Sequence, residues 1–121
     1  MTKIERTHTN ARMSKIVRYD GIIFLCGQTA VGAGISDIEG QTAEVLERVD
    51  RMLSEAGSDR SRILSAMVHL KAIDDFAAMN RVWEAWVPPG SAPARTTVEA
   101  ELASPELLVE VTVVAAATDR R

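Results

Sequence analysis

The chain has little cysteine, few aromatic residues and no excess of positive charge. Its 121 residues include one cysteine, so no disulfide can form within the chain, and a lone thiol suits a reducing compartment. Its five aromatic residues (Phe 2, Trp 2, Tyr 1) leave the core to Val, Ile, Leu, Ala and Met. The net charge of −3 argues against non-specific nucleic-acid binding, which depends on a basic surface that neutralises phosphates.

Long apolar segments are also missing. No apolar run approaches the roughly 18 residues of a membrane-spanning helix, and the opening segment MTKIERTHTN lacks the apolar stretch of a signal peptide. We therefore expect a cytoplasmic protein with no membrane partner. The two histidines, His8 and His69, lie far apart and in no ligand-spaced pair, so we expect no metal site.

Strand and helix patterns alternate along what we expect to be one domain, residues 1–121. Alternating or apolar runs predict strands at 3–7, 14–19, 22–27 and 63–73, and 3–4 spacing predicts helices at 38–56 and 76–87. Two more strands, joined by a short turn, are expected within 93–117. Asp20 and Gly21 indicate a hairpin between the second and third strands. The order βββαβαββ favours an α+β fold, with one mixed sheet and both helices on one face.

One face of that sheet would have no cover within the chain. Leu64 is expected beneath the helices. The residues expected on the uncovered face are Met67, His69, Val109, Val111 and Val113. A large apolar face needs a cover, and a second subunit is the expected one, so the pattern predicts an oligomer.

Arg95 and Glu110 each place a charge in a predicted strand, at a position where an uncharged residue is expected. Arg95 opens the penultimate strand, and Glu110 lies in an otherwise almost wholly apolar run, where desolvating a carboxylate is costly unless it is compensated. Held on neighbouring strands, the two predict a small pocket for an anionic, proton-exchanging ligand, since arginine can donate two parallel hydrogen bonds to a carboxylate. The alternative is structural: Arg95 pairs with Glu99, Glu101 or Glu110.

Three further polar residues also have two interpretations. Cys26 follows four apolar residues and is by default a buried, inert thiol, although a nearby cation would make it reactive. Asn80 borders the apolar stripe of the second helix, either as an ordinary boundary residue or as a donor aimed at the end of the sheet. His69 is interpreted as a sheet-face or interface residue rather than a ligand.

Three segments resemble the RidA/YjgF family of small imine deaminases, also described as L-PSP endoribonuclease-like. They are CGQTAV at 26–31, DDFAAMNRVWEAW at 74–86, and PARTTVEAEL at 93–102 followed by LLVEVTVVA at 107–115. The most specific feature is an arginine after Pro-Ala, followed by an acidic residue in the closing strand. The resemblance covers nearly the whole chain. It implies a chorismate-mutase-like α+β domain that forms a homotrimer with clefts between subunits.

The activity that this resemblance implies is hydrolysis of reactive 2-imino and enamine acids to 2-oxo acids and ammonia. Arg95 would hold the substrate carboxylate, and Glu110 would orient a water molecule and accept its proton. No cofactor is implied, because an iminium is already electrophilic. The further substrate-binding positions that the family implies are Gly27, Thr97, Asn80 and Cys26.

Three positions depart from the central group of the family. Met13 stands where a tyrosine is usual, Cys26 where a hydroxyl residue is usual, and Thr97 where a cysteine is often found. The departures indicate a divergent branch with a changed substrate wall. Alternatives are therefore a deaminase for an aminoacrylate- or aminomuconate-type intermediate, or a non-catalytic small-molecule-binding or chaperone-like member. A ribonuclease is disfavoured by the acidic balance and the lack of paired histidines.

Overall fold

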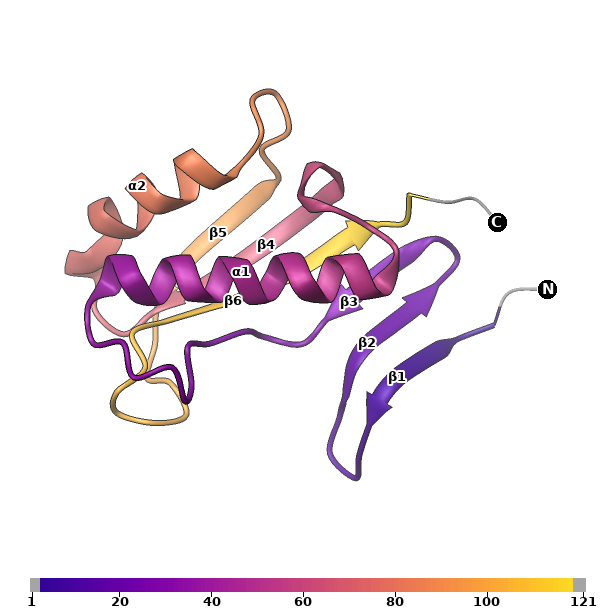
Figure 1. Ribbon diagram of the computed structural model, residues 1–121, viewed down its shortest axis with the longest axis horizontal. Coiled ribbons are helices and arrows are strands. Elements are labelled where there is room, and N and C mark those ends of the chain that lie inside the picture. The colour runs from indigo at the N-terminus through magenta and orange to yellow at the C-terminus, as the bar shows by residue number, and fades with distance from the viewer. Residues whose placement is uncertain (1–2, 119–121) are drawn as a thin grey trace.

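A mixed six-stranded sheet, covered on one face by two helices, forms the fold of the computed structural model, which describes residues 3–118 (Figure 1). The elements are β1 (Glu5–Thr9), β2 (Ser14–Tyr19), β3 (Ile22–Leu25), α1 (Ile38–Ala56), η1 (Arg60–Arg62), β4 (Ile63–Leu70), η2 (Ile73–Asp75), α2 (Phe76–Trp86), β5 (Ala94–Glu99) and β6 (Val109–Ala116). The predicted order βββαβαββ and the α+β class are confirmed.

The last strand does not lie beside the strand that precedes it. The order across the sheet is β1-β2-β3-β6-β4-β5, with β4 and β5 parallel and all other neighbours antiparallel. Strand β4 thus separates β5 from β6, and residues 100–108 connect them as a loop rather than a short turn. The expectation that Arg95 and Glu110 occupy neighbouring strands is wrong, because β6 enters the middle of the sheet while β5 stays at its edge.

Local signals placed several boundaries correctly. Asp20 and Gly21 form the predicted hairpin turn, with φ of 54° and 80°. The side chain of Asp37 accepts a hydrogen bond from the backbone N–H of Gly40 and so caps α1, whose other end is closed by Gly57 at φ 89°.

Other boundaries moved by two or three residues at strands and by one at the second helix. The first strand covers Glu5–Thr9 rather than 3–7. The third strand ends at Leu25, although Gln28 still bridges to Val111. The strand expected over 63–73 ends at Leu70, and α2 ends at Trp86.

The core lies between the helices and the inner face of the sheet. α1 buries one face against the sheet, and the inward residues of β6 are all buried, namely Val109, Val111, Val113 and Ala115. The expectation that the three valines face outward is therefore wrong. Glu110 pairs with His69, whose neighbours Val68 and Leu70 are fully buried, so the pleat turns Glu110 to the uncovered face and the valines inward.

Leu64 departs from the expected alternation as well. Its exposed fraction is 47%, whereas the neighbouring Ile63 is 5% exposed and packs in the core. The register between β4 and β6 shifts between Ile63 and Ser65, so a bulge leaves Leu64 as an extra residue and breaks the two-residue period.

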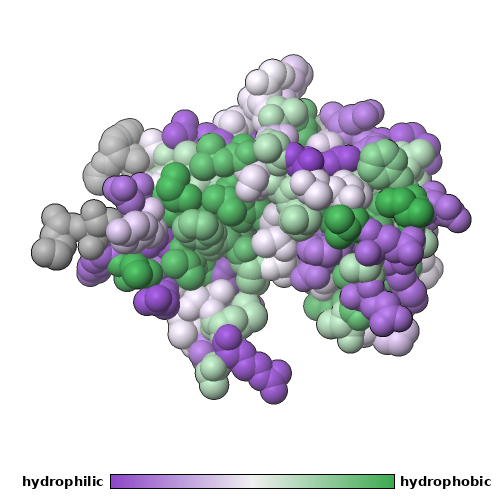
Figure 2. Space-filling view, turned by 180° about the vertical axis from the view of Figure 1, so that it is seen from behind, coloured by the Kyte–Doolittle hydropathy of each residue, from purple (hydrophilic) through white to green (hydrophobic). Residues whose placement is uncertain are grey.

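The face opposite the helices carries a hydrophobic surface that we call the open face (Figure 2). Its large exposed apolar side chains are Tyr19, Phe24, Met67 and Val98. Met67 and His69 lie on this face, as predicted. Within residues 3–118, neither helix is long and apolar enough to cross a membrane, and no group of three acidic, histidine or cysteine side chains gathers as a metal site.

Candidate functional site

Arg95 lies on the helix-covered side of the sheet edge, in contact with α2. Its Cα pairs with that of the buried Ala66, and its guanidinium carbon lies 5.2 Å from the ring centroid of Trp83 and 5.8 Å from that of Phe76. One guanidinium nitrogen is also 3.9 Å from the sulfur of Met79. We call Arg95 and these three α2 side chains the Arg95 cluster. Both rings attract the cation through their faces.

No carboxylate in residues 3–118 forms an ion pair with Arg95. Burial lowers the pKa of its guanidinium from the ordinary value, and the charge of Glu84 acts in the opposite direction. The carboxylate of Glu99 instead accepts a hydrogen bond of 2.7 Å from the backbone N–H of Ile73. The structural alternative, in which Arg95 pairs with a nearby glutamate, is not what this chain does. A half-buried guanidinium therefore keeps its capacity to bind an anion.

Two other predicted residues lie on the elements that form the Arg95 cluster, β5 and α2. Thr97 follows Arg95 by two residues on β5 and so shares its side of the sheet, and its hydroxyl oxygen is buried with no hydrogen-bond partner among the described residues. Asn80 is half-buried on α2, one turn after Phe76 and three residues before Trp83. Arg95 and Thr97 thus share one side of β5, whereas a contact between Asn80 and either residue stays a prediction.

Glu110 lies on the other side of the sheet, on the open face. Its carboxylate packs over the Cα of Gly27: a Cβ built at Gly27 would lie 2.2 Å from the Glu110 Oε2 and 3.0 Å from the Thr112 hydroxyl. Only glycine fits without displacing the carboxylate. The half-buried Glu110 side chain has neither an ion pair nor a hydrogen bond among the described residues.

Cys26 lies next to Gly27, in a segment that the bridge between Gln28 and Val111 fixes against β6. The side-chain amide of Gln28 donates to the Cys26 carbonyl at 3.2 Å and to its sulfur at 3.3 Å. Burial raises the pKa of the Cys26 thiol, and the Gln28 hydrogen bond and the charge of Lys15 offset this only in part. The default interpretation of an unreactive thiol fits this environment. We call Glu110, Cys26, Gly27, Thr112 and the neighbouring His69 the Glu110 cluster.

The two clusters occupy opposite faces of one sheet. Arg95 shares the face of Ala66, whereas Glu110 shares the face of His69, on the other side of β4. Within one chain they do not form a single pocket, which corrects the simple pocket expected from the sequence. Alternation in β4 makes Ala66 and His69 face opposite ways, but only the pairing of β4 with β5 and β6 relates this to Arg95 and Glu110.

Sequence reasoning missed how Arg95 is supported. Phe76 and Trp83 were recognised only as part of an apolar helix stripe, yet their rings contact the guanidinium. Their spacing of seven residues, two helical turns, places them on one side of α2 and could have indicated a cradle for a cation.

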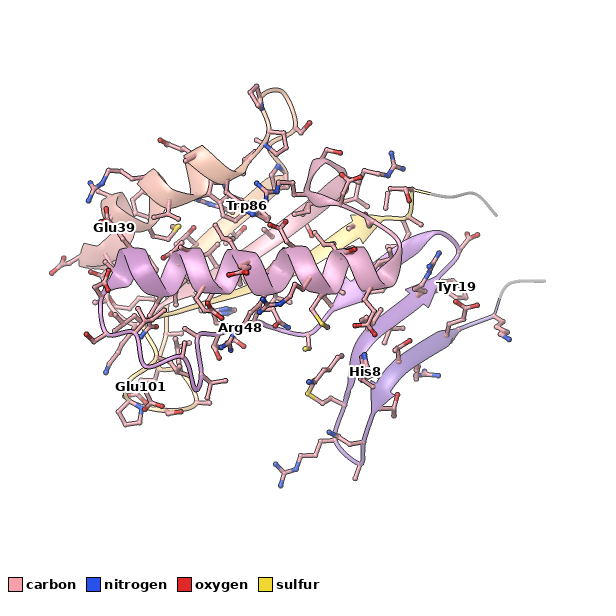
Figure 3. All side chains as sticks on the ribbon, in the orientation of Figure 1. His8, Tyr19, Glu39, Arg48, Trp86 and Glu101 are labelled. Carbon is pink, nitrogen blue, oxygen red and sulfur yellow. The ribbon has the colours of Figure 1, made fainter. Side chains whose placement is uncertain are left out.

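A second arginine shows how a structural guanidinium differs. Arg60 also stacks on a tryptophan, 5.0 Å from the ring centroid of Trp86, but it makes two hydrogen bonds to Asp50 on α1. Asp50 also accepts from the Trp86 indole, which lies between the two helices (Figure 3). Arg60 therefore stabilises the packing of α1 against α2.

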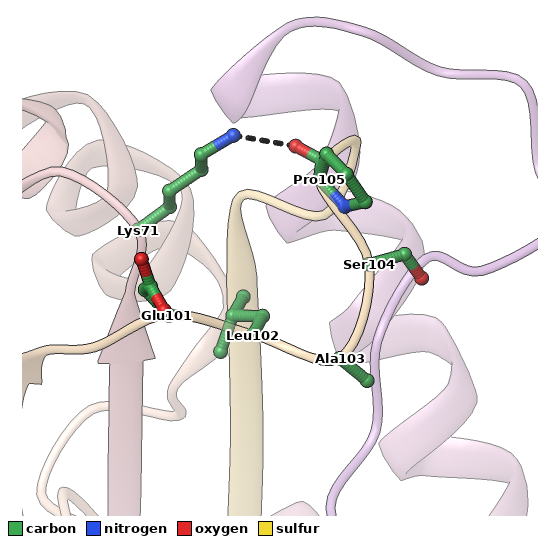
Figure 4. Close-up of a pocket in the computed structure, with 6 residues that line it drawn as sticks. All are labelled: Lys71, Glu101, Leu102, Ala103, Ser104 and Pro105. Atoms are coloured by element: carbon green, nitrogen blue, oxygen red, sulfur yellow. Dashed lines mark hydrogen bonds between the residues drawn. The ribbon is translucent and has the colours of Figure 1, made fainter.

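Two hollows lie away from both clusters. The first, about 260 Å³, is lined by the loop after β5, where the Lys71 ammonium donates to the Pro105 carbonyl at 2.5 Å (Figure 4). The second, about 360 Å³, lies between residues 30–36 and 105–108, beside Gln41. Neither contains a residue of the Arg95 or Glu110 cluster.

Comparison with known proteins gives a consistent result. The family model described as "Endoribonuclease L-PSP" matches residues 3–117. A RutC family protein of Haemophilus ducreyi is 39% identical over 113 residues, which are 93% of this chain and 96% of that relative. The RutC family protein YoaB of Escherichia coli is 40% identical over 114 residues, 93% of this chain and 97% of the relative.

Solved structures extend the likeness to the fold. NMB1025 of Neisseria meningitidis, described as a member of the YjgF protein family, superposes with a TM-score of 0.92 at 42% identity and covers 98% of both chains. A Pseudomonas aeruginosa protein superposes with a TM-score of 0.89 at 38% identity, covering 95% of this chain and 99% of its own.

Proposed function

The chain belongs to the RidA/YjgF family, whose model is described as endoribonuclease L-PSP, and from this premise we propose that it is a cytoplasmic, cofactor-free deaminase. Its substrates in this proposal are reactive 2-imino and enamine acids, which it hydrolyses to 2-oxo acids and ammonia.

The observation that carries the proposal is a pair of half-buried charges without ion-pair partners in residues 3–118 of their own chain. Arg95 has a cradle of rings but no carboxylate, and Glu110 has a glycine beneath it but no cation or donor. Half-buried charges of this kind are normally compensated, because their desolvation costs free energy. A ligand that brings a carboxylate to Arg95 and a polar reacting centre to Glu110 would supply both partners.

Two clusters on opposite faces need a second copy of the chain to meet. Arg95 lies on the edge strand β5, and Glu110 lies on the open face that an oligomer would cover. We propose that the edge of one subunit meets the open face of the next, so that Arg95, Thr97 and Asn80 of one chain face Glu110, Gly27 and Cys26 of its neighbour. In a homotrimer this contact repeats around a closed ring and produces three identical clefts.

The chemistry then follows from the two charges. Arg95 binds the substrate carboxylate through two parallel N–H donors and so orients the C=N carbon. Glu110 accepts a proton from water while the water oxygen forms a bond to that carbon and the C=N π electrons move to nitrogen. The resulting carbinolamine loses ammonia as its hydroxyl becomes the carbonyl of the 2-oxo acid.

A coupled assay tests this function directly. An amino-acid oxidase or dehydratase generates the 2-imino acid in situ, semicarbazide traps the remaining imine, and 2-oxo acid formation is followed with and without the protein. We expect the protein to compete with the trap and release more 2-oxo acid. A wild-type protein that leaves the trapped fraction unchanged for imines with small, branched and acidic side chains contradicts the proposal.

The same assay separates the alternatives. A non-catalytic binder would bind small carboxylates in calorimetry without changing the trapped fraction. A deaminase for an aminoacrylate- or aminomuconate-type intermediate would be inactive on simple imines and active on those compounds. A ribonuclease would cleave RNA in a parallel arm, but His8 contacts Glu55 and lies on β1, separated by three strands from β4, which carries His69 (Figure 3).

A further inference from the structure

His69 is the strongest polar feature that the proposed reaction does not yet use. It lies on β4 directly opposite Glu110 on β6, on the open face. The backbone N–H of Lys71 donates to the Leu108 carbonyl at 3.0 Å, which makes that opposite pair a hydrogen-bonded one. Since hydrogen-bonded pairs recur every second residue, His69 and Glu110 form such a pair too, with Cα atoms about 5.5 Å apart.

The His69 ring has an unusual hydrogen-bond state. Its Nδ1 atom is buried and has no partner among the described residues. The Nε2 atom makes no hydrogen bond among the described residues either, but it is not fully buried, so it is accessible from the open face. Because buried polar side-chain atoms are rarely left unpaired, a lone Nδ1 beside a lone carboxylate calls for an explanation.

Few charged groups face His69 within residues 3–118. Met67 shares its face on β4, and Lys71 follows directly after the strand, where its ammonium is held by the Pro105 carbonyl. On β6 the neighbours that share its face are Glu110 and Thr112, and on β5 the paired residue is Val98. Lys71 and Glu110 are therefore the charged groups that face His69 from the elements packed against it.

The proposed hydrolysis needs a proton donor as well as a base. Glu110 leans toward Gly27 on one side, and His69 flanks it on the other. We propose, resting on the deaminase function above, that His69 is a further catalytic residue, the general acid that protonates the departing nitrogen.

The protons and electrons balance in three steps. Glu110 takes a proton from water as the C–O bond forms, which converts the iminium into a neutral carbinolamine. The imidazolium of His69 then donates its proton to the amine nitrogen. The C–N bond breaks with its electron pair leaving on ammonia, the hydroxyl proton returns to His69, and Glu110 gives its proton to ammonia to form ammonium.

Two variants of His69 test the proposal. His69→Ala removes the acid and leaves space for a small molecule, whereas His69→Phe keeps a ring of similar size on the open face. We expect kcat to fall about 10²-fold or more in both, the usual range for a general acid, with KM nearly unchanged because Arg95 binds the carboxylate. Added imidazole should restore part of kcat in His69→Ala and none in His69→Phe.

The pH dependence of kcat is a measurement that a purely structural role of His69 would not change. After subtraction of the uncatalysed rate, the wild type should show a bell-shaped pH profile, because the proposed reaction needs one group as a base and another as an acid. In His69→Ala the alkaline decline should disappear. Leu64→Ala is the control, since it shortens an exposed side chain on the same strand outside both clusters and should keep both limbs and kcat.

The outcomes distinguish this proposal from the function on which it rests. An active wild type with unchanged kcat in both His69 variants overturns the role of His69 alone. A lower kcat without imidazole rescue and with the alkaline limb intact also overturns it, because a packing defect explains that result. An inactive wild type overturns the deaminase function, and the role of His69 with it.

Discussion

Single residues show two ways to hold a guanidinium. Arg95 and Arg60 both stack on tryptophan rings, but only Arg60 also has a carboxylate, Asp50, within hydrogen-bond distance. A cation over an aromatic face gains about 0.5–2 kcal/mol, which is enough to orient the group but does not neutralise it. Arg95 is thus positioned and still able to bind an anion.

Substitution of Arg95 should separate binding from folding. We expect Arg95→Ala to lose small-carboxylate binding and deaminase activity by on the order of 100-fold, because a bidentate contact to a charged ligand is removed. Arg95→Lys should recover only part, since an ammonium cannot form the two-pronged contact. Calorimetry with a 2-oxo acid and thermal melting are the measurements.

Arg60→Ala is the matched control for that experiment. It should lower the melting temperature, because Asp50 loses its partner, and leave carboxylate binding intact. Near wild-type binding by Arg95→Ala would show that the anchor lies elsewhere.

Glu110 is predicted to be catalytic rather than structural. Glu110→Gln keeps size and hydrogen-bonding capacity but removes basicity, so turnover should fall by about 10²–10⁴-fold. The melting temperature should change little, because no ion pair within the described chain is broken. Kinetics and melting are measured on the same preparation, with Glu99→Gln as a control that alters a carboxylate bonded to backbone. A turnover within about threefold of wild type beside a clear loss of stability would assign Glu110 a structural role.

Cys26 is predicted to be an unreactive thiol at neutral pH. Burial raises its pKa, so the thiolate is scarcer than for a free cysteine, and alkylation by iodoacetamide at pH 7 should be slower than in urea. By linkage, the thiol's contribution to stability is fully present below the unfolded-state pKa and is lost as pH rises through the raised folded-state pKa. Cys26→Ser should remove that alkaline loss in denaturation curves. Rapid alkylation of the folded protein at pH 7 would point instead to a lowered pKa.

At the scale of elements, one buried amide joins α1 to two loops. Gln41 is 1% exposed, and its side-chain nitrogen donates to the carbonyls of Ile35 at 2.8 Å and Glu106 at 2.9 Å. Its oxygen accepts from the backbone N–H of Leu108 at 2.8 Å, directly before β6 begins. The helix thus determines where the strand carrying Glu110 enters the sheet.

Gln41→Leu should destabilise the protein markedly. Three backbone groups lose the amide in a buried place, and each unpaired group costs about 1–3 kcal/mol, so we expect a loss on the order of 3 kcal/mol in urea denaturation. Thr42→Val is the control: its hydroxyl bonds the Ile38 carbonyl within the helix, and its loss should cost about 1 kcal/mol or less. Equal losses in the two variants would contradict the linking role of Gln41.

At the scale of the whole molecule, the open face requires a cover. Phe24 and Met67 are 45% and 39% exposed on the sheet face opposite α1 and α2, the two α-helices within residues 3–118 (Figures 1 and 2). Exposed apolar patches of this kind mark interaction surfaces. From the charges of the two clusters, which lack ion-pair partners in residues 3–118, we propose that the occupant is another copy.

We expect a homotrimer in solution. Light scattering after size exclusion should give close to three times the 13.2 kDa of one chain. Phe24→Asp should shift the protein toward monomers, because it places a charge in the buried contact, whereas Val31→Asp, at an exposed loop position, should not. A stable wild-type monomer at micromolar concentration would remove the basis for a site shared between chains.

Much of the fold could be read from local patterns. The 3–4 spacing from Ile38 to Ala56 predicted α1 to the residue, and Asp20-Gly21 predicted the first hairpin, because each signal depends only on neighbours in sequence. Gln41 was not predicted as buried, since its partners are remote: Glu106 and Leu108 lie more than 60 residues further along the chain.

The sequence by itself determined the element order, the α+β class, the family and the two residues on which the proposed chemistry depends. Tertiary structure alone decided that β4 separates Arg95 from Glu110 and that the two face opposite ways. Side-chain alternation shows which residues share a face within one strand, but only the pairing of strands remote in sequence relates the faces of β5 and β6. That pairing left each charge without an ion-pair partner among the described residues and placed His69 beside Glu110, and it is the basis of our proposal that two chains complete the site.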